Sequence, residues 1–417
     1  MTDPTGKRLP AKQEKPAVQP SLAQYFAVSG PGLERLTAHE LHKLGSLPEP
    51  PAVADTTQST GNDLEGGVSF SGDLHELYRA NLHLRTASRV LVRLGEFRAV
   101  AFYELRKKAA RLPWESYLTP GQPVSLRVTC RKSRLYHSDA VAERVVGAIG
   151  DRLNRPSRAL AYAEDSMSDE VQLVIVRFVH DICTISIDSS GAGLHRRGYR
   201  LAVAKAPLRE TLAAGIILAA RWHSEQPLVD PFCGSGTIAI EAALLASARP
   251  PGLDRKFAFM NWPGYDPAAW QKLGRETMFA GPPPQPVILA SDRDAGAINM
   301  AQENADRAGV AEWIDFKQQA FSAIAPAGRG WVITNPPYGV RVSTTQDLRN
   351  LFAHLGDVLR QHCPGWNYAI LSNEDKLIAQ LHLPEAGRLW LENGGLPVKL
   401  VMGMVPEINS MSKIHAD

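Results

Sequence analysis

Two short motifs, each placed directly after a short apolar segment, constrain the fold of this 417-residue chain more than any other feature. The first motif, Asp230-Pro-Phe-Cys-Gly-Ser-Gly-Thr237, follows 227–229 and precedes an apolar stretch at 238–247 that we expect to be helical. The second motif, Asn335-Pro-Pro-Tyr338, follows the apolar residues 331–334. Strand, glycine loop and helix in this order are typical of a doubly wound α/β sheet, where ligands bind at the carboxyl ends of parallel strands. We therefore expect both motifs to border one crevice.

The first motif predicts a cofactor loop. Its glycines let the backbone approach a ligand closely, and the N-terminus of the following helix offers unpaired N–H groups. We expect cofactor contacts from Asp230, Pro231, Phe232, Gly234, Ser235, Gly236 and Thr237. An alternative role for Asp230 is to cap the turn.

A further carboxylate follows the next expected strand, at 287–290. Asp292 is placed to accept the ribose hydroxyls of an adenosine, and Arg293 lies beside it. The separation of Gly236 from Asp292 is much longer than the roughly 20 residues of a dinucleotide-binding fingerprint. An insertion rich in proline, glycine and aromatic residues, 249–286, accounts for the difference. The spacing therefore disfavours a dinucleotide.

The second motif predicts chemistry on the exocyclic amine of a nucleobase, which is a poor nucleophile because its lone pair is delocalised into the ring. The side-chain oxygen of Asn335 and the carbonyl of Pro336 can each accept one N–H, which points the lone pair at an electrophile and stabilises the developing charge. Pro336 and Pro337 fix φ and add no competing donor, while Tyr338 offers a flat face for stacking. Together the motifs indicate methyl transfer to an amine. The alternative for the second is a Pro-Pro turn with a packed tyrosine.

Further segments occur in the order found in a known family. They are 128–137, Leu194-His-Arg-Arg-Gly-Tyr-Arg200, 206–213, 240–243, 250–253, 257–259 with Trp262, 292–294 and 303–305. With the two motifs they make the chain resemble the class I S-adenosylmethionine (SAM)-dependent RNA methyltransferases that carry an N-terminal THUMP domain, especially the bacterial group that methylates guanine N2 in 23S rRNA. The resemblance implies SAM as cofactor, 23S rRNA as partner, and direct in-line transfer without a metal. A tRNA guanosine is the alternative substrate.

One position departs from the family pattern. Relatives tend to place an aspartate shortly before the second motif, where it accepts the adenine amino group of the cofactor. This chain has Gln319 at about that position. A glutamine oxygen can still accept a hydrogen bond, so we expect Gln319 and Asn335 among the cofactor contacts.

Basic residues concentrate in the first half of the chain, where 85–160 holds sixteen Lys and Arg against six Asp and Glu. Within this excess, basic and aromatic residues follow one another closely, a pattern suited to phosphate contact with base stacking. We expect RNA contacts from Arg127, Arg131, Lys132, Arg134, Tyr136 and His137, with Arg127 and Arg131 on one face of a strand and Lys132 and Arg134 on the other. The alternative is a solvated basic face.

The segment from Leu194 to Arg200 connects the basic half to the cofactor loop. Its arginines Arg196, Arg197 and Arg200 have two possible roles, contact with RNA or pairing with carboxylates in a structural hinge. The residue pattern does not choose between them.

The fold class predicted is α/β, with five segments along the chain. They are a disordered tail (1–20), a ferredoxin-like subdomain (21–97), a THUMP RNA-binding domain (98–190), a linker (191–206), and a Rossmann-like methyltransferase domain with a seven-stranded, mostly parallel sheet (207–417). Among the expected elements are a helix at 74–87 and a hairpin at 393–395 that joins the last two strands. Relatives exist in which this half is fused to a second methyltransferase, and we expect no such domain within these 417 residues.

Composition restricts the setting. No run of 18 apolar residues occurs, the first 20 residues lack an apolar signal core, and the four cysteines have no metal-binding spacing. We therefore expect a cytoplasmic, monomeric enzyme with RNA as partner, no membrane and no metal. Adenine-N6 methylation of DNA and a non-catalytic RNA-binding or ribosome-assembly factor remain as alternatives.

Overall fold

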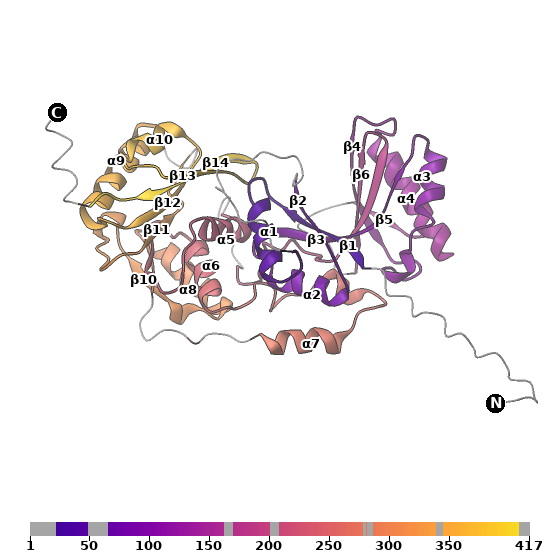
Figure 1. Cartoon of the computed structure of the whole chain (residues 1–417), viewed down its shortest axis with the longest axis horizontal. Coiled ribbons are helices and arrows are strands. Elements are labelled where there is room, and N and C mark those ends of the chain that lie inside the picture. The colour runs from indigo at the N-terminus through magenta and orange to yellow at the C-terminus, as the bar shows by residue number, and fades with distance from the viewer. Residues whose placement is uncertain are drawn as a thin grey trace, which may run out of the picture.

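The computed structural model describes residues 22–48, 66–161, 170–200, 208–277, 281, 287–338 and 345–407. They form two seven-stranded sheets, one in each half of the chain (Figure 1). The predicted tail, 1–20, and the last part of the linker that we expected at 191–206, from residue 201 on, lie outside these residues.

The N-terminal sheet has the order β2-β1-β3-β7-β6-β4-β5. Its strands are β1 (Ala23–Ser29), β2 (Gly67–Gly72), β3 (Ala87–Arg98), β4 (Val124–Arg131), β5 (Ala159–Leu160), β6 (Gln172–Val179) and β7 (Ile182–Asp188). The helices of this half are α1 (Glu34–Lys43), α2 (Leu74–His83), α3 (Phe102–Ala109) and α4 (Ser138–Leu153). The long strand β3 pairs with β1 on one side and with β7 on the other. It therefore crosses the boundary that we predicted between residues 97 and 98 and joins both N-terminal domains in one sheet.

The helix expected at 74–87 ends early, because α2 stops at His83 and Leu84 adopts an extended backbone. Glu40 of α1 explains this end. Its carboxylate accepts the backbone N–H groups of Arg85 (2.8 Å) and Thr86 (3.0 Å), which a continuing helix would use internally.

The C-terminal sheet has the order β10-β9-β8-β11-β12-β14-β13. Strand β14 alone runs in the direction opposite to the other strands. Its strands are β8 (Leu228–Asp230), β9 (Ile288–Asp292), β10 (Ile314–Gln318), β11 (Trp331–Thr334), β12 (Asn367–Ser372), β13 (Gly387–Asn393) and β14 (Leu396–Met404). The helices are α5 (Glu210–Ala219), α6 (Thr237–Ala246), α7 (Pro267–Glu276), α8 (Ala295–Ala308), α9 (Thr345–His362) and α10 (Asp375–Gln380). This confirms the predicted seven-stranded, mostly parallel sheet, and the hairpin at 393–395 joins β13 to β14.

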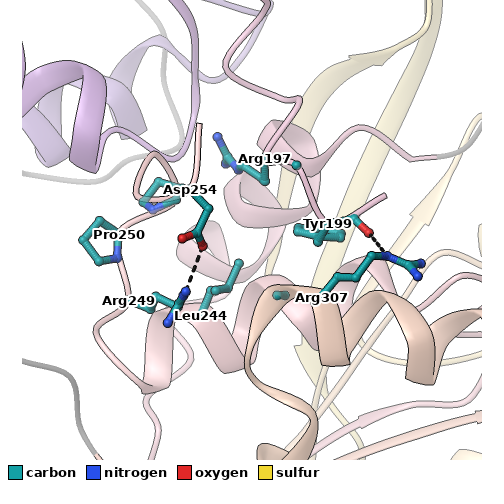
Figure 2. A pocket seen from close by; sticks show the side chains of 10 residues that line it. Arg197, Tyr199, Leu244, Arg249, Pro250, Asp254 and Arg307 are labelled. Atoms are coloured by element: carbon teal, nitrogen blue, oxygen red, sulfur yellow. Dashed lines mark hydrogen bonds and ion pairs between the residues drawn. The ribbon is translucent and has the colours of Figure 1, made fainter. Parts of the chain in front are cut away.

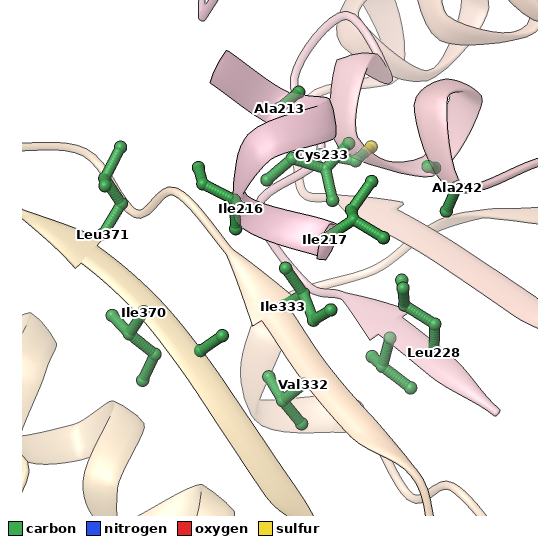
Figure 3. Packing of buried hydrophobic residues seen from close by; sticks show 14 of the residues in the cluster. Ala213, Ile216, Ile217, Leu228, Cys233, Ala242, Val332, Ile333, Ile370 and Leu371 are labelled. Atoms are coloured by element: carbon green, nitrogen blue, oxygen red, sulfur yellow. The ribbon is translucent and has the colours of Figure 1, made fainter. Parts of the chain in front are cut away.

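The core of the C-terminal half lies between this sheet and its helices. Apolar side chains of α5, β8 and β11, among them Ile217, Leu228 and Ile333, meet at its centre (Figure 3). All three are at most 1% exposed. The two central strands β8 and β11 are short apolar runs that end in Asp230 and Thr334 at the carboxyl edge, as expected for strands covered on both faces.

The insertion at 249–286 packs against the N-terminal half. The ring of Phe259 stacks on Tyr78 of α2 with centroids 4.6 Å apart, and the indole N–H of Trp262 donates to the side chain of Gln172 in β6 (2.8 Å). Helix α7 lies beside α2 (Figure 1). The insertion therefore joins the two halves through a shared apolar cluster.

Candidate active site

The two motifs lie side by side at the carboxyl edge of the C-terminal sheet. Strands β8 and β11 are parallel neighbours, with Leu228 opposite Trp331. At their ends the Thr334 hydroxyl donates to Asp230 Oδ1 at 2.6 Å, which joins the first motif to the residue before the second. The two motifs are therefore neighbours, as predicted, because their strands are adjacent.

Asp230 is 1% exposed and also accepts the backbone N–H of Phe232 (3.3 Å), so it caps the turn as one of our alternatives proposed. Burial raises the pKa of Asp230 to about 7, the hydrogen bonds from Thr334 and Phe232 oppose the rise, and the nearby Asp292 carboxylate adds to it. A cationic ligand group beside Asp230 would favour the ionised form of this carboxyl group.

The glycine loop owes its shape to two residues in the left-handed region, Gly234 (φ 51°) and Gly236 (φ 83°). A Cβ atom on Gly236 would lie 2.9 Å from the Cβ of Ala301 in α8, so the loop sits directly on that helix. Asp292 closes the other side, because its Oδ2 accepts the N–H of Gly234 (3.1 Å).

Asp292 therefore lies where the ribose prediction requires it, beside the loop at the end of β9. Its Oδ1 accepts the N–H of Asp294 (3.0 Å), and the N–H of Gln319 donates to its backbone carbonyl (3.0 Å). This last bond brings Gln319 next to Asp292, and the exposed Arg293 follows at the start of the turn into α8. The three residues that we assigned to the adenosine side, Asp292, Arg293 and Gln319, thus lie at the same edge.

An aromatic pair lies at this edge, formed by the predicted Phe232 and by Phe321, which the sequence analysis missed. The ring of Phe321 stacks on Phe232 with centroids 4.9 Å apart, and His354 of α9 meets Phe321 edge-on at 5.1 Å. The only sequence signal was an aromatic residue two positions after Gln319. Flat apolar surface at this point suits an adenine ring.

The side chain of Asn335 offers the hydrogen-bond acceptor that binding of an amine needs. Among the described residues, its side-chain oxygen is buried and has no hydrogen-bond partner. A buried acceptor without a partner costs about 1–3 kcal/mol, and an amine N–H would satisfy it. Pro336, whose carbonyl we expect to accept the second N–H, is buried, and Pro337 is half-buried.

Tyr338 is less accessible than its proposed stacking role suggested. Its side chain is 5% exposed, and its hydroxyl accepts a hydrogen bond from Asn393 Nδ2 (3.0 Å) at the end of β13. Residues 339–344, which follow it, lie outside the described part of the chain. Base stacking on Tyr338 stays a prediction.

Nucleophilic catalysis by Cys233 is not supported. The thiol is 7% exposed, and burial together with Asp230 and Asp292 raises its pKa far above the ordinary value. A protonated thiol would not attack a substrate.

The connector contacts the cofactor loop through buried charges. Arg197 is 5% exposed and donates to Glu241 of α6 (3.3 and 3.4 Å) and to the carbonyl of Arg85 (2.5 Å). Arg200 forms an ion pair with Glu210 (3.5 Å) and donates to the Thr237 hydroxyl. These contacts match the structural alternative, in which Arg197 is buried and the side chain of Arg200 is 12% exposed. RNA contact by the connector stays a prediction. Arg196 is exposed.

A cavity of about 80 Å³ lies between the connector and helices α6 and α8 (Figure 2). Arg249 pairs with Asp254 at its rim (2.8 Å), and Arg307 donates to the carbonyl of Tyr199 (2.7 Å). The guanidinium groups that line it therefore have partners within the chain.

The six residues of the basic half that we expected to bind RNA are all exposed. Arg127 and Arg131 alternate with half-buried residues along β4, on the face that also carries Arg177 of β6, opposite Thr129. The Tyr136 ring, 66% exposed, lies 4.0 Å from His137 between centroids. One detail was wrong. Lys132 and Arg134 lie in the turn after β4, where Lys132 has a φ of 49°, and not on the other face of the strand.

None of the described helices is both long and apolar enough to span a bilayer. Within the described residues, no group of three or more His, Cys, Asp or Glu side chains is arranged to hold a metal ion.

Three family models match the chain in succession. They are the RlmL ferredoxin-like domain (24–91), the THUMP domain (100–188) and the RMKL-like methyltransferase domain (197–399).

Two curated relatives extend this match. A protein of Synechocystis sp. that is named as a candidate RNA methyltransferase is 35% identical over 90% of this chain and 95% of its own length. The ribosomal RNA large subunit methyltransferase K/L of Syntrophotalea carbinolica is 35% identical over 91% of this chain, which spans about half (53%) of that relative.

Solved structures of methyltransferases are similar to this chain over most of its length. The methyltransferase candidate SMU.472 in complex with SAH has a TM-score of 0.77 at 28% identity and covers 91% of this chain and 97% of its own. A predicted N6-adenine-specific DNA methylase of Listeria monocytogenes has a TM-score of 0.80 at 32% identity, with 93% and 97% covered. On the order of its three domains and the Synechocystis match over nearly the full length of both proteins, the chain belongs to the THUMP-containing, RlmL-like family of class I SAM-dependent RNA methyltransferases.

Proposed function

We propose that this chain transfers a methyl group from SAM to the exocyclic N2 of a guanosine in 23S rRNA. The observation that carries the proposal is the side-chain oxygen of Asn335, which is buried and has no hydrogen-bond partner. Asn335 directly follows Thr334, whose hydroxyl donates to Asp230 of the cofactor loop. An acceptor of this kind beside a cofactor site is suited to an amine.

The residues present fit SAM. The loop 230–237 would hold the amino-acid part, with the Asp230 carboxylate available to its ammonium group, and Asp292 would accept the ribose hydroxyls. Gln319 lies beside Asp292, and Phe321, two positions further along, stacks on Phe232 of the loop, so the adenine would bind here. When bound, SAM supplies a methyl group that its sulfonium centre makes electrophilic.

The chain's own contribution is to position and polarise the base. A guanine that has left its helix would place N2 against the Asn335 oxygen and the Pro336 carbonyl. These acceptors orient the nitrogen lone pair and stabilise the positive charge that develops on N2. No enzyme nucleophile takes part, and the methylated amine releases its proton to water.

The choice of RNA rests on the N-terminal half. The exposed arginines of β4 and the Tyr136–His137 pair suit phosphates and unstacked bases. The relative from Syntrophotalea carbinolica is named for ribosomal large-subunit RNA, which supports 23S rRNA as the substrate. We further infer that the enzyme acts as a monomer in the cytoplasm.

The second candidate is methylation of adenine N6 in DNA, which the name of the Listeria structure suggests. Asn335 and Pro336 would serve that amine equally well, so the motif does not separate the two bases. The THUMP domain favours RNA.

The test is methyl transfer from labelled SAM to deproteinised bacterial RNA that lacks its own modification, followed by nucleoside analysis. N2-methylguanosine in the 23S fraction is the expected result. The same nucleoside in tRNA would keep the chemistry and change the substrate, and N6-methyladenosine would overturn the base assignment. Transfer to a ribosomal particle but not to free RNA would identify the particle as the substrate.

A further inference from the structure

The cofactor loop rests on one face of helix α8. Ala301 lies directly under Gly236, and Asn304, one turn further along, donates from Nδ2 to the backbone carbonyl of Ser235 at 3.0 Å. Residues three apart share a helix face, so both contacts support the same stretch of loop. Asn304 is 1% exposed.

Arg307 determines which way the Asn304 amide faces. Its Nη2 donates to Asn304 Oδ1 at 2.6 Å, so the amide nitrogen must point at Ser235. Were the amide to turn over, its oxygen would face the Ser235 carbonyl and its N–H groups would face a guanidinium. Both contacts would then be repulsive. Arg307 thus fixes the donor that the loop carbonyl needs.

The same arginine continues the network into the connector. Its Nε donates to the carbonyl of Tyr199 at 2.7 Å (Figure 2). The Tyr199 hydroxyl donates to Glu241 (3.2 Å), and Glu241 also accepts from Arg197, which holds the carbonyl of Arg85 in the N-terminal half. Hydrogen bonds therefore run without a break from the first half of the chain to Ser235.

We propose that Asn304 and Arg307 are positioning residues that set the shape of the cofactor loop and tie it to the connector. The inference rests on the proposed function only in taking SAM, or its product S-adenosylhomocysteine (SAH), as the ligand of the loop. Neither side chain needs to touch the ligand. They act by keeping the Ser235 carbonyl in place, so that the loop does not have to reorganise on binding.

The experiment measures SAH binding by calorimetry to the full chain. Asn304→Ala removes the buried hydrogen bond to the Ser235 carbonyl together with the one from Arg307, and we expect about tenfold weaker SAH binding, with kcat at saturating SAM unchanged within about twofold. Asn304→Asp separates positioning from bulk stability. It strengthens the contact with Arg307 but turns an acceptor toward Ser235, so it should bind SAH at least as weakly as Asn304→Ala.

Two further variants complete the design. Arg307→Met should weaken SAH binding about threefold, and combined with Asn304→Ala it should add nothing, because Arg307 acts on the loop through Asn304. Ile298→Val shortens a buried side chain on the same helix and serves as the control, which lowers the melting temperature but leaves SAH affinity unchanged.

The outcomes separate the two proposals. Wild-type affinity for SAH in both Asn304 variants, or additive losses in the double variant, would overturn the positioning role. A milder loss for Asn304→Asp than for Asn304→Ala would do the same, because it would show that the donor to the Ser235 carbonyl does not govern SAH binding. If the wild-type chain itself failed to bind SAH, the proposed function would fall.

Discussion

Asn393, at the end of β13, donates a hydrogen bond to the hydroxyl of Tyr338, the last residue of the Asn-Pro-Pro-Tyr motif, at 3.0 Å. The two residues are 55 positions apart in the sequence and meet because β13 runs parallel to β12 and ends at the same edge as β11. The tip of the β13–β14 hairpin thus fixes the ring that we expect the substrate base to stack on.

This contact predicts that Asn393→Ala and Tyr338→Phe have similar effects. Each removes the same hydrogen bond but leaves the tyrosine ring or its phenylalanine equivalent in place. We expect kcat/KM for RNA to fall about three- to tenfold in either variant, and no further in the double variant. The measurement is methyl transfer at saturating SAM. Independent, multiplying losses would show that Asn393 acts elsewhere.

Asn335→Ala should abolish turnover, because the amine loses its side-chain acceptor. Removing a single preorganised group of this kind costs about 10²–10³ in kcat, and the loss here should be at the upper end. Cofactor binding should remain nearly intact, since the glycine loop and Asp292 are unchanged. Turnover and SAH affinity are measured on the same preparation, and activity near that of the wild type would sink the catalytic assignment.

The sequence was sufficient for the elements whose conformation is locally determined. Gly234 and Gly236 require positive φ, which marks the loop between β8 and α6, and apolar runs mark the parallel strands. The crevice could be predicted for the same reason, because parallel strands present their carboxyl ends together.

Contacts between distant residues could not be predicted in this way. Arg197 and its partner Glu241 are 44 positions apart, so the charge pattern of the connector did not reveal that it is buried. Asn304 and Asn393 act on residues 69 and 55 positions away. Helix α7 was missed although the sequence carries signals for it, because Asp266 caps its first turn and Pro267 stands at its first position, and its Trp270 packs edge-on against Tyr78 of α2.

RNA binding should depend strongly on salt through the open face of the N-terminal sheet. Replacing Arg127 and Arg131 with glutamine removes two exposed positive charges, so the slope of log affinity against log salt should become shallower by about 1.5. Filter binding or fluorescence anisotropy at several salt concentrations measures it.

Arg106→Gln is the matched control for that series. Arg106 is also an exposed arginine of the basic half, but it pairs with Asp151 (2.7 Å) on the helical side. Its loss should leave the salt slope unchanged. An equal effect of all three substitutions would mean that net charge, and not the β4 face, governs binding.

The protonation of Asp230 should make stability depend on pH in the absence of cofactor. Its pKa is about 7 in the folded chain, because of burial, against about 3.9 in an unfolded one. The folded state therefore binds more protons between these values, and the free energy of unfolding falls as pH rises from about 4 to about 7. The contribution is at most about 4 kcal/mol for a difference of this size.

Asp230→Asn keeps an oxygen acceptor for Thr334 without the charge. It should be more stable than the wild type at pH 8, with the difference vanishing near pH 4, as followed by denaturant unfolding. If the free energies of unfolding of the wild type and of Asp230→Asn changed with pH in parallel, Asp230 would already be ionised in the folded state at low pH.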